Sequence, residues 1–370
     1  MRTVAAHVAR PLKAGLVSVM MPAYNAAAFI GQAIDSVFDQ TLEDWELIII
    51  DDGSTDATSE VVGKYSDRRI RLFRQPNQGE ASARNAALSK IQGEYLAFLD
   101  ADDRFLPPHL EITRQYLKDY AGIQAVYTDG YYISQENIRT ARLSGHRRGP
   151  FQGDLFEPLV RASDVFGPPT CVVTKARPVL EHQLTFDPKI VIGPDWDFFR
   201  QLSEIVVFGY LDRPTCEYRV HLSNISLVTG DRERRSSLAR CRQKAILSPR
   251  FSDCSSKTRT YAFYDLLINL VSDQPGEQEA LTQQPAFNGL PANQRARLYR
   301  LMASEAIVAR ELRAPINQWL NLAAALDPAS MRNQILRALH TMTPRITRWT
   351  LMVRRAGKRR NSQSPFAAVS

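Results

Sequence analysis

Residues 46–56 read ELIIIDDGSTD, an almost unbroken apolar run that ends in two adjacent carboxylates and a turn. A short apolar run rich in isoleucine and bounded by turn residues is typical of a strand buried on both faces of a parallel sheet. Similar runs alternate with segments of helical period on either side, between Leu16 and residue 133. This alternation predicts βα units, and therefore an α/β fold with an open, mostly parallel, Rossmann-like sheet flanked by helices.

The same pattern divides the chain into four parts. Residues 14–133 carry the regular βα units, and residues 134–228 continue them with weaker periodicity after a stretch rich in arginine, glycine, proline and serine. Residues 229–344 contain helical segments with scattered leucine, alanine and arginine, which predicts a mainly helical C-terminal extension. Residues 345–370 are basic and then contain serine and proline, and we expect them to be disordered.

The net charge of +8 is unevenly placed. No acid follows Asp327, so the bases beyond it account for the excess and leave the body of the chain close to neutral. These bases are Arg332, Arg337, Arg345, Arg348, Arg354, Arg355, Lys358, Arg359 and Arg360. The tail is therefore expected to meet an anionic membrane surface, with a solvated tail or a nucleic-acid contact as the alternatives. Because the body is neutral, we do not expect a nucleic acid as the partner of the protein.

The cysteines and the N-terminal region indicate where the protein works. The chain has four cysteines and no CxxC pair, which excludes a zinc ribbon and a disulfide-rich scaffold. We therefore expect a reducing, cytoplasmic location, peripheral at the inner face of the membrane. Residues 14–34 carry no charge, as in a signal peptide or membrane anchor, but Pro22 and Asn25 interrupt them. We interpret this stretch as a strand, a turn and a helix, with Asn25 as the helix N-cap.

Two groups of aspartates follow predicted strands. Asp51 and Asp52 end one strand, and Asp100, Asp102 and Asp103 end another. Ligands of an open α/β sheet bind outside the carboxyl ends of its strands, so both groups are expected to line one cleft. Either group alone also suits a helix cap or a solvated turn. Together they predict a site for Mg²⁺ or Mn²⁺, which prefer oxygen ligands and leave positions open for substrate phosphate.

Other phosphate-binding motifs are absent from the sequence. It contains neither GxGxxG nor GxxxxGK followed by serine or threonine, and it has no HExxH. This argues against a dinucleotide dehydrogenase and a P-loop NTPase. A metal ion held by acids is therefore the main anion clamp that the sequence offers.

Four motifs in a fixed order carry a resemblance to a known family. They are PAYN at residues 22–25, IDDGSTD at 50–56, NQGEASARNAAL at 77–88 and FLDADD at 98–103. With them the chain resembles the family 2 glycosyltransferases, which have the GT-A fold. The resemblance implies an inverting, metal-dependent enzyme that transfers a single sugar from a nucleotide-diphosphate sugar, above all a UDP-sugar. The implied acceptor is a hydroxyl of a glycan or a lipid-linked molecule in envelope or surface polysaccharide synthesis.

The resemblance also implies roles for residues on the donor side. Asp102 is similar to the aspartate that binds the metal directly, and Asp100 to an acid on the ribose side. For Arg84 the alternative is an exposed, solvated helix residue. The residues expected to hold the donor nucleotide are Pro22, Tyr24, Asp52, Arg84 and Asp100.

On the acceptor side the resemblance leads to the segment GPDWDFFRQL at residues 193–202. Asp195 is the candidate catalytic base, although Pro194 stands where the family often has glutamate, and Asp197 is its rival. A helix cap is the alternative for Asp195. In EYRVHLSNIS, Arg219 and His221 are candidates for a contact with the diphosphate or the metal, with a structural role as the alternative for the histidine.

Other functions fit these observations less well. A sugar-nucleotide pyrophosphorylase also uses an α/β nucleotide site and Mg²⁺, but the sequence lacks a glycine-rich N-terminal phosphate loop with a following lysine. A catalytically silent nucleotide-sugar-binding or interaction protein is the main alternative, and it predicts that Asp195 lies apart from Asp102. RITRW at residues 345–349 resembles the QxxRW of processive synthases, but arginine replaces glutamine and no apolar stretch follows. We therefore expect transfer of one sugar.

Overall fold

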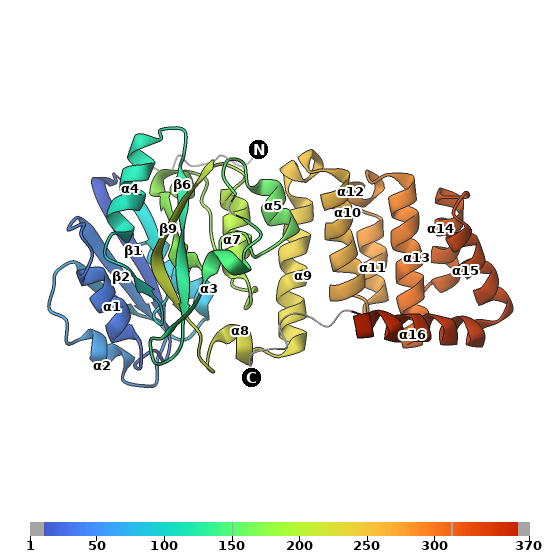
Figure 1. Ribbon diagram of the computed structural model, residues 1–370, viewed down its shortest axis with the longest axis horizontal. Coiled ribbons are helices and arrows are strands. Elements are labelled where there is room, and N and C mark those ends of the chain that lie inside the picture. Colours follow the sequence, from blue (N-terminus) through green and yellow to red (C-terminus); the bar gives the residue numbers. More distant parts are fainter. Residues whose placement is uncertain (1–10, 150, 312–313, 362–370) are drawn as a thin grey trace. The chain divides into compact units, whose positions relative to one another are not determined.

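The computed structural model describes residues 11–149, 151–311 and 314–361 (Figure 1). The chain forms two compact units, residues 1–241 and residues 242–370. The divide falls inside helix α9 (Asp231–Leu247), later than the change at residue 229 that the sequence pattern indicates. The first unit contains the sheet, and the second is helical in its described part.

In residues 11–149 and 151–241 of the first unit, the structure describes a sheet of nine strands in the order β3-β2-β1-β4-β8-β6-β9-β5, with β7 paired to β6. The strands are β1 (Lys13–Ala23), β2 (Trp45–Asp51), β3 (Ile70–Arg74), β4 (Gly93–Phe98), β5 (Arg104–Phe105), β6 (Ala125–Ile133), β7 (Arg139–Arg142), β8 (Val172–Lys175) and β9 (Phe208–Arg219).

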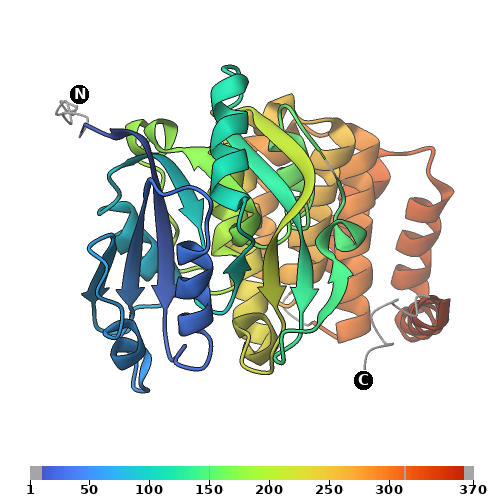
Figure 2. The ribbon, with the colours of Figure 1, turned by 60° about the vertical axis from the view of Figure 1, so that its left-hand side comes forward.

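The two halves of the sheet differ in strand direction. β1 pairs in parallel with β2 and β4, and β2 with β3, as the alternating pattern predicts. These strands are the blue to cyan arrows of Figure 2. The other half is mixed, because β8 runs antiparallel to both β4 and β6, whereas β6 and β9 are parallel. The α/β fold with a helical C-terminal region is thus confirmed, and the antiparallel pairs lie in the half where the sequence periodicity is weak.

Helices cover both faces of this sheet (Figure 1). They are α1 (Ile30–Phe38), α2 (Thr58–Val62), α3 (Glu80–Leu88), α4 (His109–Asp119), α5 (Phe156–Arg161), α6 (Ala176–Glu181), α7 (Pro194–Leu202) and α8 (Ile225–Val228), with short 3₁₀ turns η1 (Leu143–His146) and η2 (Pro169–Cys171). Helices α1 and α4 share one core cluster with Leu47 and Ile49, and α3 and α7 share the other with Ile48 and Ile50.

Strand β2 is buried along its whole length because its alternate side chains enter these two cores. Each fully buried isoleucine or leucine side chain contributes about 2 kcal/mol by leaving water. The strand end that carries Asp51 and Asp52 is therefore held firmly between two packed layers. β1 and β4 end beside it, so the polar loops that follow these strands lie at one edge of the sheet.

The second unit begins with the last turn of α9. Its elements are the 3₁₀ turn η3 (Pro249–Asp253), α10 (Ser256–Tyr264), the π-helical turn η4 (Asp265–Leu270), α11 (Pro275–Thr282), α12 (Pro285–Asn288), α13 (Ala292–Ala309), α14 (Ile316–Leu326), α15 (Met331–Met342) and α16 (Pro344–Asn361). Helix α16 lies across the direction of α13, α14 and α15 (Figure 1).

Helix α16 corrects one expectation, because residues 345–361 are helical rather than disordered. Pro344 occupies the first position of the helix, where a missing N–H has no cost, and good helix formers such as arginine, leucine and methionine follow it. Buried Thr347 anchors the helix, and its hydroxyl donates to the carbonyl of Thr343 at 3.0 Å. Residues 362–370 lie outside the described residues. Among the described helices, none has the length and apolar character needed to cross a membrane.

Candidate active site

The turn after β2 is fixed by Asp51, whose side chain is fully buried. Its carboxylate accepts hydrogen bonds from the backbone N–H of Ser54 at 2.8 Å and from the hydroxyl of Ser59, and Arg74 lies 3.7 Å away. Burial by itself raises the pKa of Asp51, but these hydrogen bonds and the arginine charge bring it below its ordinary value. Asp51 is therefore a structural anion that shapes the DDGSTD turn.

Asp52 fastens the loop that leads into α3. Its Oδ1 atom accepts from the side-chain amide of Gln75 at 2.7 Å and the N–H of Gln78 at 3.0 Å, and its Oδ2 atom accepts from the N–H of Gly79 at 2.7 Å. Gly79 has φ +86°, a conformation that glycine adopts without strain. A carboxylate has about four acceptor positions, so these three hydrogen bonds use most of the capacity of the buried Asp52 side chain.

The PAYN loop is bound to the DDGSTD turn by hydrogen bonds. Asn25 donates its backbone N–H to the hydroxyl of Ser54 at 3.0 Å, and its side-chain oxygen accepts from the N–H of Thr55 at 2.8 Å. The expected N-cap role of Asn25 is therefore wrong, since α1 begins at Ile30 and Asn25 instead adopts a left-handed φ of 48° to reach the turn. Pro22 is half-buried and Tyr24 is exposed beside this junction, free to meet a ligand.

Arg84 is buried inside an ion cluster rather than exposed on its helix. Its Nη2 atom lies 2.6 Å from Asp100 and 2.6 Å from Glu80, which is one helical turn earlier. The guanidinium carbon also lies 5.4 Å from the centre of the Phe186 ring. The alternative of a solvated arginine is thus wrong, and Arg84 joins α3 to the loop after β4.

The cluster shifts the titration of its members. Burial raises the pKa of Glu80 to about 7 against the opposing pull of Arg84, and the charges of Asp100, Asp195 and Asp102 add to the rise. The pKa of Arg84 is held above its ordinary value, because the nearby carboxylates outweigh its burial. Glu80 was not predicted from the sequence, although its position four residues before Arg84 is the spacing of a helical ion pair.

Asp195 lies in the first turn of α7, after Gly193 in a left-handed conformation with φ +80°. It is partly exposed, and no described residue forms a hydrogen bond or ion pair with its carboxylate. Its charge acts on Glu80, Arg84 and Asp100, which places it at the same end of the sheet.

The rival Asp197 is in a different environment. It is buried, and its carboxylate lies 3.3 Å from the guanidinium of Arg200 and accepts from the amide of Gln201 at 3.0 Å. A group committed in this way cannot take a proton from an acceptor hydroxyl without first breaking its ion pair. The geometry therefore favours Asp195.

Asp102 and His221 are far apart in the sequence, but their side chains are in contact. The Nε2 atom of His221 lies 2.8 Å from Oδ2 of Asp102, and its Nδ1 atom lies 2.9 Å from the hydroxyl of Ser223. The imidazole packs against the Phe29 ring with centres 4.8 Å apart. Asp102 remains partly exposed, with 27% of its side-chain surface open to solvent.

Asp102 and His221 are the side chains to consider as ligands of the Mg²⁺ or Mn²⁺ ion expected from the sequence. No cluster of three or more histidine, cysteine or acidic side chains suited to a metal occurs in the described ranges. Asp102 and His221 nevertheless place a carboxylate oxygen and a ring nitrogen 2.8 Å apart, and both groups are ligands that Mn²⁺ accepts. Two protein ligands leave coordination positions for the diphosphate oxygens and water, which is how Mg²⁺ and Mn²⁺ bind at nucleotide sites.

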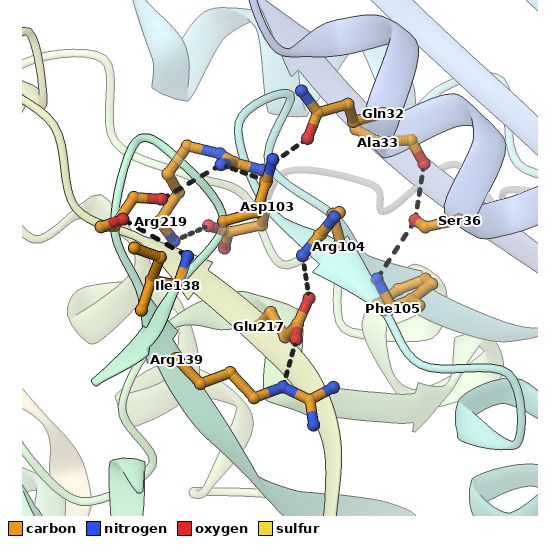
Figure 3. A network of polar contacts seen from close by, with 12 residues as sticks. Gln32, Ala33, Ser36, Asp103, Arg104, Phe105, Ile138, Arg139, Glu217 and Arg219 are labelled. Atoms are coloured by element: carbon orange, nitrogen blue, oxygen red, sulfur yellow. Dashed lines mark hydrogen bonds and ion pairs between the residues drawn. The ribbon is translucent and has the colours of Figure 1, made fainter. Parts of the chain in front are cut away.

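Arg219 is committed to the protein (Figure 3). Its Nε atom donates to the carbonyl of Asp102 at 2.8 Å, Nη1 donates to Asn137 at 2.7 Å, and Nη2 donates to Gln32 at 3.0 Å. Its backbone N–H donates to buried Asp103 at 2.9 Å. The structure thus commits Arg219 to positioning the loop after β4, whereas the ring of His221 contacts the side chains of Asp102 and Ser223.

A second ion cluster supports the loop after β4. Glu217 is buried on β9 and lies 2.6 Å from both Arg104 and Arg139 (Figure 3). Asp103 accepts from the hydroxyl of Thr170 at 2.5 Å, and burial together with the charges of Asp102 and Asp100 raises its pKa. Asp103 is therefore a buried support of the loop, unlike its partly exposed neighbours.

The arrangement defines a class of protein. An α/β sheet whose carboxyl edge brings together an open aspartate, a buried arginine bound to aspartate and an aspartate–histidine pair is suited to polarised nucleotide substrates. Similar folds are found in solved structures of TarS residues 1–349 from S. aureus, at a TM-score of 0.52 and 15% identity over 88% of this chain and 91% of that one. The complex of the same protein with UDP-GlcNAc gives a TM-score of 0.54 at 14% identity, with the same coverage. This likeness shows the GT-A fold.

Sequence comparison then gives the family. Residues 18–175 match the family described as glycosyl transferase family 2, so this segment of the chain is a family 2 glycosyltransferase domain. It is 33% identical over 242 residues to a chondroitin synthase of Pasteurella multocida, covering 60% of this chain and 22% of the relative. It is 45% identical over 98 residues to the UDP-Glc:alpha-D-GlcNAc-diphosphoundecaprenol beta-1,3-glucosyltransferase WfgD of Escherichia coli, covering 26% and 39%. The chain thus spans less than half the length of either relative.

Proposed function

We propose that the chain is an inverting glycosyltransferase that moves a single sugar from a nucleotide-diphosphate sugar, above all a UDP-sugar, to a hydroxyl of a glycan or lipid-linked acceptor. The family supports sugar transfer, and by their names one relative synthesises chondroitin and the other transfers glucose to a sugar linked to diphosphoundecaprenol. The name of the E. coli relative gives both a UDP-glucose donor and a diphosphoundecaprenol acceptor. A place in envelope or surface polysaccharide synthesis is part of this proposal.

The main observation in support of this proposal is the position of the Asp195 carboxylate. Asp195 lies at the carboxyl edge of the sheet, its charge acts on the Arg84 cluster, and no described residue occupies its oxygens. A silent binding protein has no need of an unsatisfied carboxylate at this place, whereas a transferase needs a base there.

Asp195 acts on the acceptor. Its carboxylate takes the proton of the acceptor hydroxyl while that oxygen attacks the anomeric carbon from the face opposite the diphosphate. The bond between the anomeric carbon and the diphosphate oxygen breaks, the nucleotide leaves with the electron pair, and the configuration at the anomeric carbon inverts. General-base assistance of this kind is worth about 10² to 10⁴ in rate.

The donor side is held by the loops that the structure has joined. Pro22, Tyr24 and Asp52 lie at the joined PAYN and DDGSTD loops and are proposed to bind the nucleoside. Arg84 fixes the carboxylate of Asp100, which leaves the second oxygen of Asp100 for a ribose hydroxyl. These side chains position the donor before the acceptor arrives, and such positioning lowers the entropic cost of the reaction.

Asp102 and His221 are proposed to hold Mg²⁺ or Mn²⁺ beside the diphosphate. When bound, the cation stabilises the negative charge of the departing nucleotide. His221 must be neutral to serve as a ligand, and its contact with Phe29 keeps the ring oriented toward Asp102.

A cytoplasmic place at the inner face of the membrane completes the proposal. The four cysteines are buried and form no disulfide in the described part of the chain, as expected of a protein kept in a reducing compartment. Nucleotide sugars and the cytoplasmic ends of lipid-linked acceptors meet at that membrane face.

The test is turnover by the full chain with UDP-, GDP- and dTDP-sugars, measured with Mn²⁺ and with EDTA, in the presence of lipid-linked and soluble glycan acceptors. We expect one UDP-sugar to be consumed at a rate that depends on Asp195. Tight nucleotide binding without turnover under every condition would contradict the proposal and leave the silent binding protein. Product analysis by NMR of the anomeric proton distinguishes inversion from retention.

A further inference from the structure

The second unit contains a cavity of about 830 Å³ between the end of α13, the start of α14 and one side of α16. This volume is within the range of sites that bind small molecules. Its walls are apolar at Ile307, Trp349 and Met352 and basic at Arg310, Arg345 and Arg348, with Glu311 as an acid beside them. A cavity with one apolar side and several arginines is suited to an anionic amphiphile.

The arginines of this cavity lack acidic partners. Among the residues that the structure describes, no carboxylate forms an ion pair with Arg310, Arg345 or Arg348. Arg348 donates from Nε to the backbone carbonyl of Val308 at 3.2 Å, which orients its guanidinium and leaves both Nη atoms for a ligand. His340 also lines the cavity, and its Nδ1 atom is buried without a hydrogen-bond partner. Among the described residues of the lining Glu311 is the one acid, so the three arginines leave an excess of positive charge that points to a negatively charged ligand.

Beside the cavity, α16 presents apolar side chains to solvent. Ile346, Trp349 and Val353 follow one another at helical spacing on one side of the helix, and Met352 lies next to them. All four are exposed, and 67% of the Trp349 surface is open to water. Large exposed apolar side chains that gather on one side of a helix mark a contact surface rather than ordinary solvent exposure.

We propose that α16 and the cavity beside it bind the surface of an anionic lipid bilayer. The exposed apolar side chains enter the boundary between headgroups and acyl chains, and the arginines bind lipid phosphate. A basic amphipathic helix with tryptophan on its apolar side is suited to this position. The inference deepens the proposed function, since it brings the transferase to a lipid-linked acceptor, and its test uses no sugar donor.

Two observations favour a bilayer over other anions. A free phosphate or nucleotide would use the arginines but leave Ile346, Trp349 and Val353 in water. A nucleic acid would also use the charges, but it has no apolar layer into which a row of such side chains could enter. The combination of charge and an exposed apolar row is the chemistry of a membrane interface.

Trp349 provides a direct readout. The chain has four tryptophans, and the other three, Trp45, Trp196 and Trp319, are at most 6% exposed. Vesicles of phosphatidylcholine and phosphatidylglycerol that carry bromine on the upper acyl carbons should therefore quench Trp349 selectively. The Trp349→Phe variant of the full chain should bind the same vesicles without this loss of fluorescence. Equal quenching in the variant would overturn the assignment of Trp349 to the interface.

Sedimentation with vesicles tests the charges. The full chain should bind vesicles that contain phosphatidylglycerol at low salt, less at high salt, and pure phosphatidylcholine weakly. Replacing two arginines in Arg345→Gln/Arg348→Gln should lower the affinity about 25-fold, about fivefold for each charge removed. The matched control Arg148→Gln/Arg177→Gln removes two exposed arginines of the first unit and should bind as the unchanged protein does.

Further outcomes decide against the proposal. Equal binding to neutral vesicles, no binding, or equal loss in both double variants would each overturn it. An oligonucleotide that competes with vesicles at equal phosphate concentration would favour a nucleic acid instead. A dimer in light scattering that dissociates in Trp349→Ser would assign the surface to a second copy of the chain. Circular dichroism of every variant checks that α16 remains helical.

Discussion

Replacing Arg84 by methionine should make the first unit less stable by an amount that grows with pH. Methionine keeps much of the side-chain volume, but it leaves Glu80 and Asp100 without the guanidinium that lies 2.6 Å from each. Breaking a buried ion pair costs about 3–5 kcal/mol. Because Glu80 and Asp100 are 28% and 22% exposed, we expect a cost below this range, about 2 kcal/mol at pH 6.

The pH dependence follows from Glu80. Its pKa of about 7 lies above the ordinary value of 4.5, so the folded protein holds a proton on Glu80 at pH 6 and loses stability as the pH rises through 7. Arg84 lowers this pKa, so its removal raises it further. At pH 6 Glu80 is protonated in both folded proteins. Above pH 7 the unchanged protein has released this proton, so its stability no longer falls with pH. The folded variant still holds the proton there and continues to lose stability as the pH rises. The difference should widen by about 1.4 kcal/mol between pH 6 and pH 8, the value of one pKa unit.

Urea unfolding at pH 6 and pH 8 measures the difference, and hydrogen exchange of peptides from β2 and β4 assigns the transition to the first unit. The double variant Glu80→Gln/Arg84→Met is the control, because it lacks the titrating carboxylate. Its stability relative to Glu80→Gln should change less between the two pH values, because Asp100 is then the remaining carboxyl in contact with Arg84 whose pKa this arginine lowers. A difference between Arg84→Met and the unchanged protein that is equal at pH 6 and pH 8 would refute the electrostatic reasoning and leave only packing against Phe186.

Three further predictions concern the reaction. Asp195→Asn should lower kcat at least about 10²-fold with a KM for the donor within a few-fold, whereas Asp197→Asn should mainly lower the urea midpoint; the reverse pattern would show that the base is Asp197. Asp102→Asn should abolish divalent-dependent turnover at unchanged Tm, and full activity of the unchanged protein in EDTA would exclude the metal. His221→Ala should raise the Mn²⁺ concentration for half-maximal activity at least about tenfold, and an unchanged Mn²⁺ requirement would remove His221 from the ligands.

The first half of the sheet could be predicted because its signals are local. Strand β2 is an uninterrupted apolar run, and the helices around it have clear periodicity. The second half depends on pairings between distant segments. β8 lies between β4 and β6 because Ala97 pairs with Val173 and Val126 pairs with the same residue from the other side. No local pattern records these pairings, so the mixed part of the sheet was not predictable.

The candidate site was likewise predictable only in part from the sequence. The positions of Asp102 and Asp195 were predictable from motifs, and the structure brings them to one edge of the sheet, although their roles remain proposals. It was not predictable which polar side chains bind other protein groups and which stay open to a ligand, because this depends on partners that are distant in the sequence. Asp52 is held by a loop more than twenty residues away, and the guanidinium of Arg219 is satisfied by Gln32 and Asn137.

The expectation of a disordered tail was wrong for a different reason. Its basic composition is typical of disordered segments, but composition ignores that residues 345–356 contain no helix breaker. The burial of Thr347 and the ion pair between Arg355 and Glu305 at 2.8 Å come from tertiary packing on α13. Helices of this length are stabilised by such packing more than by intrinsic propensity.

The guanidinium of Arg219 has a consequence for how the protein is made. Ribosomes deliver the chain from its N-terminus, so residues 14–133, with the donor-side motifs, emerge well before residue 219. Gln32 and the carbonyl of Asp102 remain without their arginine partner until most of the first unit has left the exit tunnel. The nascent donor half is thus expected to keep a loosely held loop after β4 during synthesis, and to become competent for its substrate only when β9 adds to the sheet. The loop that carries Asp102 is therefore expected to reach its final arrangement only when translation of the first unit is nearly complete.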